Sequence, residues 1–329
     1  MKRILSVLLF CFIYAGIIKA QTTVNQGKAI AEIFTDFHYN LNDTSKTTGF
    51  GLNRAYLGYR YQPEGNFYGT LILNIGSPDD LSADATHRRY AYFREASMSY
   101  SKDNLNVSFG ITSTRLFDFQ QKFWGKRYVA NTYQSNNGYG YVADLGLVVD
   151  YKFNDFVTAD FTLMNGEGYS ELQLDNILKT SMGFIIKPIK QIAIRLYGDV
   201  NKPHGILQYT LIGFVGFKNE LITLGGEASY KTNLDLNEGH DAWGISATGG
   251  IIIFKKAEIF ARYDYSTSVI LPGDILQWHH KIDGSFAVYG LQYTFSQNVK
   301  LALSYQGSNA YDSGTKNSNA IYVNGLFKF

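Results

Sequence analysis

The stretch Ala257–Tyr265, which reads AEIFARYDY, decides the fold class of this chain. Every second residue from Ala257 to Tyr265 is apolar or aromatic, and the residues between them include Glu258, Arg262 and Asp264. Side chains alternate between the two faces of a β-strand, so a strand here has one apolar face and one polar face. The pattern therefore predicts an amphipathic strand rather than a helix, whose apolar residues recur three or four positions apart.

The same period of two recurs along the whole chain, as in Arg54–Gln62, Val142–Lys152 and Val299–Gln306. We count sixteen candidate strands, which begin near residues 29, 50, 66, 90, 104, 139, 156, 177, 192, 207, 221, 243, 257, 282, 299 and 319. Short turns of two or three residues alternate with loops of about 6 to 27 residues. A soluble antiparallel sheet shows the same side-chain alternation, but alternating short and long connections are typical of bacterial outer-membrane barrels. We predict an all-β fold, a transmembrane antiparallel β-barrel of 16 strands with short periplasmic turns and longer outer loops.

The composition excludes other classes of protein. Aromatic residues make up 16% of the 329 residues and charged residues 18%, below the ~25% usual in soluble domains. The mean hydropathy of −0.14 is too polar for a bundle of membrane helices, and no apolar run beyond residue 21 reaches the ~18 residues of a helical span. The net charge of +2 argues against nucleic acid as a partner, because phosphate binding requires many basic residues.

The N-terminus has the features of an export signal. Lys2 and Arg3 precede an apolar run from Ile4 to Ile18, and the small residue Ala20 follows. This pattern predicts a signal peptide over residues 1–20 and a mature barrel over residues 21–329, in the outer membrane of a Gram-negative bacterium. The alternative is an N-terminal membrane anchor, but the run is short for a span of ~20 residues. The single cysteine lies in this segment, so the mature chain has no disulfide and no thiol ligand.

The predicted strand number implies a wide interior. Sixteen strands ~4.7 Å apart and tilted by ~40° enclose a cylinder roughly 30 Å across, and barrels of 16–18 strands leave an aqueous channel. The longest connection, residues 112–138, is the third outer loop, and it is rich in aromatic and basic residues. We expect this loop to fold inward as a constriction; alternatively it covers the barrel rim or contacts a neighbouring subunit. Its candidates for the solute path are Arg115, Asp118, Lys122, Trp124, Lys126 and Arg127.

Charged residues on the polar strand faces should point into the lumen. The candidates that we single out are Arg54, Arg60, Asp160, Arg195, Arg262 and Asp264. Over all predicted strands the inward face carries eight basic and ten acidic residues, so the lumen as a whole does not select anions. Any preference for anions should then come from the basic third loop, because charges act most strongly where a pore is narrowest.

Several short motifs resemble the phosphate-selective porin O and P type of Gram-negative outer-membrane porin. They are Asn53–Tyr59, Arg94–Tyr100, Asn165–Gly168, Ala261–Tyr265 and the last strand, which ends at Phe329. The resemblance implies a 16-stranded channel, usually a trimer, that passes anions. The chain departs from the family in its second strand, where Asn53 and Tyr56 stand at positions that are Arg in some members.

These observations favour a passive diffusion channel for small hydrophilic solutes or ions. The alternative is a substrate-specific channel for phosphate-type anions or for sugars and oligosaccharides, which would stack on Tyr56, Phe123, Trp124 and Tyr128. A lipid-hydrolysing barrel would need a Ser–His pair on its outer face. The six histidines lie mostly in predicted loops or face inward, so we expect no enzyme and no catalytic residue. A purely structural or adhesive barrel does not explain the wide interior.

We expect no cofactor and no metal site. The acidic segment Asp235–Asp241 lacks the spacing of a calcium loop, because Ser246 stands at the last ligand position. The expected partners are the transported solutes or ions, outer-membrane lipid with lipopolysaccharide, and two further copies of the chain in a homotrimer.

Overall fold

The structure is a computed structural model, and it describes residues 27–42, 48–63, 65–75, 91–173, 175–269, 271, 283–311 and 317–329. The predicted signal peptide, residues 1–20, lies outside the described residues. Among the described residues, no helix has the length and apolar character needed to cross a membrane.

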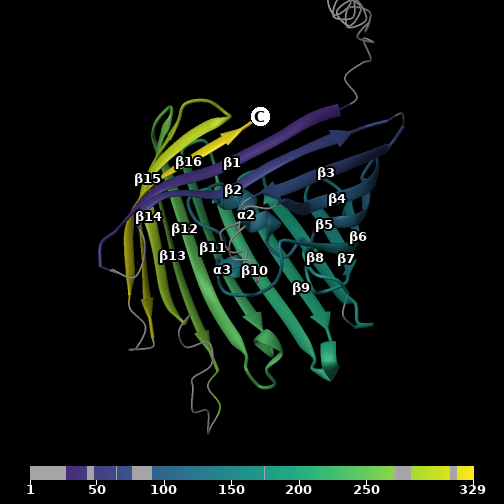
Figure 1. The fold of residues 1–329 in the computed structure, drawn as a ribbon. Helices are drawn as coiled ribbons and strands as arrows, with labels where there is room; N and C mark the ends of the chain where they lie inside the picture. Colours follow the sequence, from purple (N-terminus) through teal and green to yellow (C-terminus); the bar gives the residue numbers. More distant parts are fainter. Residues whose placement is uncertain are drawn as a thin grey trace, which may run out of the picture.

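Sixteen antiparallel strands close into a barrel in which β1 pairs with both β2 and β16 (Figure 1). The predicted all-β barrel and its strand number are confirmed. The strands are β1 Gly27–Asn40, β2 Gly49–Tyr61, β3 Phe67–Ile75, β4 Ala91–Lys102, β5 Leu105–Ser113, β6 Ala143–Lys152, β7 Val157–Met164, β8 Lys179–Ile189, β9 Ile192–Asn201, β10 Gln208–Lys218, β11 Ile222–Lys231, β12 Ala242–Phe254, β13 Ala257–Ser268, β14 Gly284–Thr294, β15 Val299–Ala310 and β16 Ser318–Lys328.

Side-chain exposure follows the predicted alternation. In β13, Ile259 and Tyr263 point outward and are 48% and 50% exposed. Their neighbours Arg262 and Asp264 point inward and are 4% and 3% exposed. The outer wall is therefore apolar and the charged residues of the strands lie inside, as expected for a barrel whose outer face contacts lipid.

The alternation breaks at a β-bulge in β4. Ile72 of β3 pairs with Glu95 and Leu73 pairs with Phe93, so Arg94 has no partner of its own in the ladder. Two successive residues of a bulged strand oppose one residue on the neighbouring strand, and this re-aims side chains. Phe93 is 46% exposed on the outer face, whereas Arg94 reaches inside and donates to the backbone oxygen of Val142.

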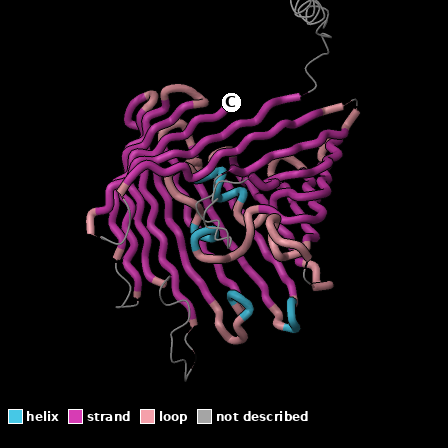
Figure 2. Tube along the Cα trace, in the orientation of Figure 1, coloured by secondary structure: helices cyan, strands magenta, loops and turns pink. Residues whose placement is uncertain are grey.

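The connection between β5 and β6 lies inside the barrel (Figure 2). We name it L3 and define it as residues 114–142; it contains the helices α2, Asp118–Trp124, and α3, Tyr133–Asn136. The short helices η2, Pro203–Gly205, and η3, Leu234–Leu236, lie instead in the β9–β10 and β11–β12 connections. These connections are at the end of the barrel that carries the longer loops, which we call the long-loop end. L3 is the element that determines which inward residues remain accessible.

Candidate functional site

The start of L3 is fixed to the wall by two arginines. Arg115 donates from Nε and Nη2 to the two carboxylate oxygens of Asp150, at 2.9 and 2.8 Å, and also pairs with Asp118 at 3.4 Å. Arg195, which pairs with Asp160, donates to the backbone oxygen of Arg115 at 2.9 Å. Burial disfavours a charged guanidinium, but the bonds to Asp150 and the charges of Asp150, Asp118 and Asp160 together outweigh burial and raise the pKa of Arg115.

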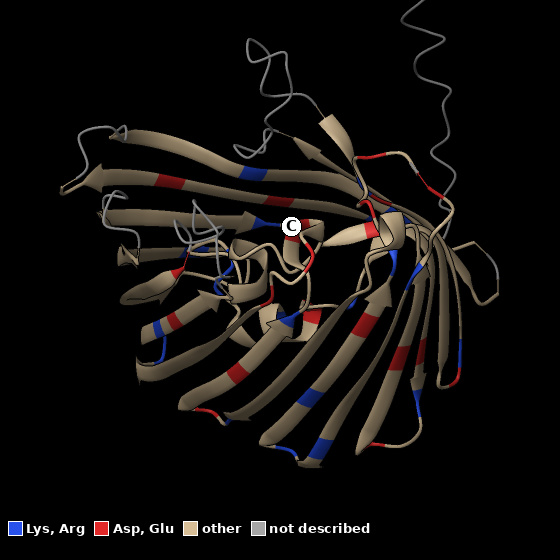
Figure 3. Ribbon diagram, turned by 90° about the horizontal axis from the view of Figure 1, so that it is seen from below, with Lys and Arg blue, Asp and Glu red and all other residues tan. Residues whose placement is uncertain are grey.

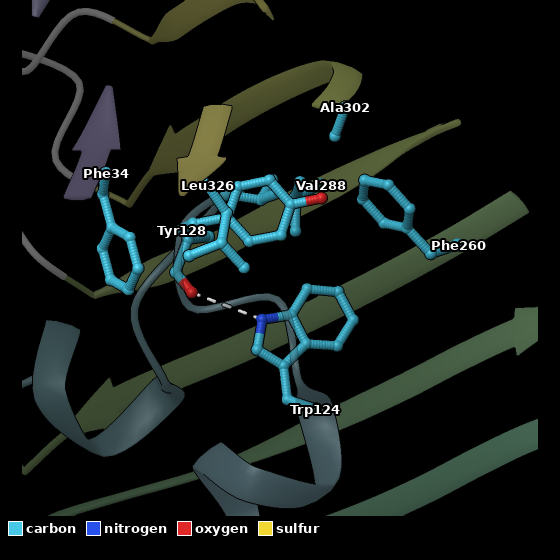
Figure 4. Close-up of a cluster of buried hydrophobic side chains, with 9 residues drawn as sticks. Phe34, Trp124, Tyr128, Phe260, Val288, Ala302 and Leu326 are labelled. Atoms are coloured by element: carbon cyan, nitrogen blue, oxygen red, sulfur yellow. Dashed lines mark hydrogen bonds between the residues drawn. The ribbon is translucent and has the colours of Figure 1, made fainter. Parts of the chain in front are cut away.

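An apolar cluster holds the middle of L3 (Figure 4). Trp124 is 5% exposed and meets the ring of Phe260 edge-on, with the ring centroids 5.9 Å apart. Tyr128 is 3% exposed and packs near Phe34, and its hydroxyl donates to Gln292 at 2.8 Å. Wall residues of this cluster come from five strands: Phe34, Phe260, Val288, Ala302 and Leu326. Truncation of a packed Phe or Trp to Ala costs about 3–5 kcal/mol.

Ionic contacts hold the same part of L3 to β13. The ammonium of Lys126 lies 2.6 Å from Glu258, and Lys126 is only 6% exposed. The Arg262 guanidinium binds Asp264 through Nε and Nη2 and donates from Nη1 to the backbone oxygen of Asn131. A buried charge is tolerated when it is paired and hydrogen-bonded in this way.

The end of L3 is bound to another part of the wall, on β11. Gln134 donates to Glu227 at 2.6 Å and to Ser229 at 3.1 Å, both on β11. Tyr133 and Tyr139 are fully buried, and burial raises the pKa of Tyr133 to about 12. Contacts with the wall therefore run along the whole length of L3.

The structure places the predicted site residues in different environments. Arg115 and Asp118 form an ion pair with each other, and Lys126 forms one with Glu258. Trp124 packs against the wall and anchors L3. Lys122 is exposed on α2. Of the predicted lumen charges, four are 1–5% exposed and pair with each other rather than facing open water: Asp160, Arg195, Arg262 and Asp264.

Three arginines form a separate cluster between L3 and the wall. We define the arginine cluster as Arg54 of β2, Arg94 of β4 and Arg127 of L3. Arg54 and Arg127 both donate to the hydroxyl of Tyr56, and Arg94 lies 5.9 Å from the centre of the Tyr169 ring. Among the described residues, no carboxylate lies within ion-pair distance of these three guanidinium groups. Figure 3 shows acidic and basic positions interleaved elsewhere on the strands.

The arginine cluster concentrates positive charge. Burial, with the charges of Arg54 and Arg94, lowers the pKa of Arg127 to about 10, although the hydroxyl of Tyr56 counters this effect. The Nε of Arg94 is buried without a hydrogen-bond partner. Arg60, the other predicted basic lumen residue of β2, lies apart from the cluster and donates to Thr70 at 3.2 Å. A dense group of cations without bound acids can attract a small anion.

A strict alternation of inward and outward residues along each strand does not predict two features of the site. Arg94 is assigned to the outer face by a strict period of two, because the bulge is not visible in the sequence. Phe260 and Phe34 are apolar residues on polar strand faces, and this mismatch is the one available signal that L3 covers those positions. Among the described residues, no group of three or more His, Cys, Asp or Glu is placed to hold a metal ion.

If Trp124 anchors L3, the Trp124→Ala variant should release it. Loss of a packed tryptophan removes about 3–5 kcal/mol of local stability. Trypsin cleaves after Lys and Arg, so we expect the folded wild type to resist cleavage at Lys126 and Arg127 and the variant to be cut there. Phe153→Ala, in an exposed turn, is the matched control and should resist like the wild type. Equal resistance of Trp124→Ala would contradict the anchor.

No protein-family model and no curated protein matches the chain. Solved structures are similar over nearly the whole barrel. The OmpF of Salmonella typhi in complex with daunomycin aligns with a TM-score of 0.70 and 10% identity, covering 93% of this chain and 99% of that chain. The outer-membrane channel DcaP of Acinetobacter baumannii gives 0.64 and 13%, covering 92% and 97%. The anion-selective porin from Comamonas acidovorans gives 0.63 and 12%, covering 92% and 99%. The chain thus has the fold of outer-membrane porins.

Proposed function

We propose that the chain is an outer-membrane channel for passive diffusion of small hydrophilic solutes, that L3 narrows it, and that it prefers anions. The closed barrel of sixteen strands and its likeness to porins support a channel. The position of L3 across the interior supports a constriction. Export by a signal peptide over residues 1–20 and insertion into a membrane that contains lipopolysaccharide belong to the same proposal.

The arginine cluster is the observation that carries the preference for anions. The basic residues Arg115 and Lys126 of L3 are paired with acids, so they add little net charge. Arg54, Arg94 and Arg127 have no such partners among the described residues, and field lines concentrate in a narrow, low-dielectric passage. Guanidinium groups bind phosphate and carboxylate in a bidentate manner, so a phosphate-type anion is the form of the substrate-specific alternative that the cluster suits.

A sugar-stacking track receives less support. Trp124 and Tyr128 are 5% and 3% exposed, and their rings pack on the wall instead of offering a face to a solute. Tyr56 is 8% exposed and is engaged by Arg54. Phe123 lies edge-on against Phe214, with the ring centroids 4.9 Å apart.

Assembly as a homotrimer is part of the proposal. One of the similar structures is the in-vitro folded OmpT of Vibrio cholerae in its trimer form, at a TM-score of 0.61 and 13% identity. The apolar outer wall offers a surface that a second copy or lipid can cover.

Neutralising the arginine cluster should reduce the preference for anions. In planar bilayers with a salt gradient, Arg94→Gln and Arg127→Gln should each shift the reversal potential toward cations, and the double variant should shift it further. Lys152→Gln is the control, because Lys152 is exposed at the end of β6 and pairs with Asp155. An unchanged reversal potential in the double variant would contradict the role of the cluster, and absence of conductance in the pure wild type would contradict the channel.

A further inference from the structure

A pocket separate from the arginine cluster opens at the long-loop end of the barrel. Its volume is about 420 Å³. The end of L3, the connection after β7, the segment around η2, the end of β11 and η3 enclose it. In Figure 2, η2 and η3 are the cyan segments at the lower edge of the barrel. Polar and apolar side chains share its surface, including Lys179, Lys231, Asn165, Asn201, Tyr141 and Ile177.

Hydrogen bonds hold the walls of this pocket in place. The carboxylate of Asp144 accepts from the backbone nitrogen of Gly166 at 2.6 Å. The amide of Gln208 donates to the backbone oxygen of Asn233 at 2.8 Å. Asn233 and Asp235 adopt left-handed backbone conformations, with φ of 46° and 53°, which persist only when the surroundings fix them. The pocket is therefore formed before any solute arrives, which lowers the cost of binding.

Lys231 supplies the chemistry of the pocket. It is 5% exposed, and its ammonium donates to the backbone oxygens of Tyr139 at 3.0 Å and Gly138 at 3.4 Å. Among the described residues, no carboxylate lies within ion-pair distance of it. The neighbouring cation, Lys179, is already bound to Asp199 at 3.0 Å. A buried ammonium without a counter-ion is costly, and an anionic group that enters the pocket removes this cost.

We propose that this pocket binds the carboxylate of a small polar solute, such as a sugar acid or an amino acid, at the outer mouth of the channel. The carboxylate pairs with Lys231. The buried Oδ1 of Asn201 has no hydrogen-bond partner and accepts from a hydroxyl or ammonium group of the solute. Tyr141 is 51% exposed and, with Ile177, offers an apolar surface to the body of the solute.

The acidic residues of the pocket limit which anions fit. Glu167, Asp175 and Asp235 also line it, and Asp235 is exposed at the surface. Their charges disfavour phosphates and other multivalent anions, but they tolerate a single carboxylate and attract an accompanying ammonium. This subsite goes beyond diffusion through the constriction, because it retains one class of solute before the narrow passage.

Calorimetric titration of the purified full chain in detergent tests the subsite without any measurement of current. The probes are galacturonate, glutamine and glucose at equal ionic strength. We expect binding of galacturonate or glutamine and none of glucose, and the probe that binds shows whether the body of the solute is a sugar or an amino acid. Binding of neither carboxylate, or equal binding of glucose, overturns the proposal, whether or not the protein conducts.

Two variants localise the binding. Lys231→Met should weaken it by at least about tenfold, because a charged partner is lost. Since Lys231 also holds L3, Ile177→Trp is the decisive variant: it fills the pocket, leaves those bonds intact and should weaken binding to a similar degree. Arg94→Gln is the control and should bind like the wild type. Unchanged affinity in Ile177→Trp, or lost affinity in Arg94→Gln, places the binding elsewhere and overturns the proposal.

Discussion

Closure of the backbone hydrogen-bond ladder is the constraint on which the rest of the structure depends. Because β1 pairs with both β2 and β16, no strand edge is left open, and the number of strands sets the width of the interior. With sixteen strands the cylinder is roughly 30 Å across, too wide for side chains from the wall to fill. A further element has to occupy the interior if the passage is to be selective, and L3 lies there.

L3 is held inside by two kinds of contact. The apolar cluster around Trp124 and Phe260 removes aromatic surface from water. The pairs that Lys126 and Arg115 form with wall carboxylates compensate for burying their charges. The same pairs neutralise Arg115 and Lys126 of L3, whereas Lys122 stays exposed and Arg54, Arg94 and Arg127 have no acidic partner among the described residues. The contacts that position the loop thus also decide which basic residues keep an unpaired charge inside the barrel.

The fold could be predicted from the sequence because a period of two over many short segments has few physical solutions. Most strands begin within about two residues of the predicted positions; the largest difference is at β6, which begins at Ala143 instead of near residue 139. Tyr139 belongs to L3 there, buried against β11 and donating to the backbone oxygen of Ser229. The site was less predictable. Which of the basic residues in L3 would be paired depends on contacts across the barrel, and the inward position of Arg94 depends on a bulge.

The most direct test of whether L3 forms the constriction compares the single-channel conductance of the wild type with that of a variant without L3. In the variant, residues 116–139 are replaced by a short Gly-Ser linker, which leaves the strands and their ladder unchanged. We expect the wild type to conduct in uniform steps and the variant to conduct in larger steps. Steps of equal size in the two proteins would contradict a constriction formed by L3.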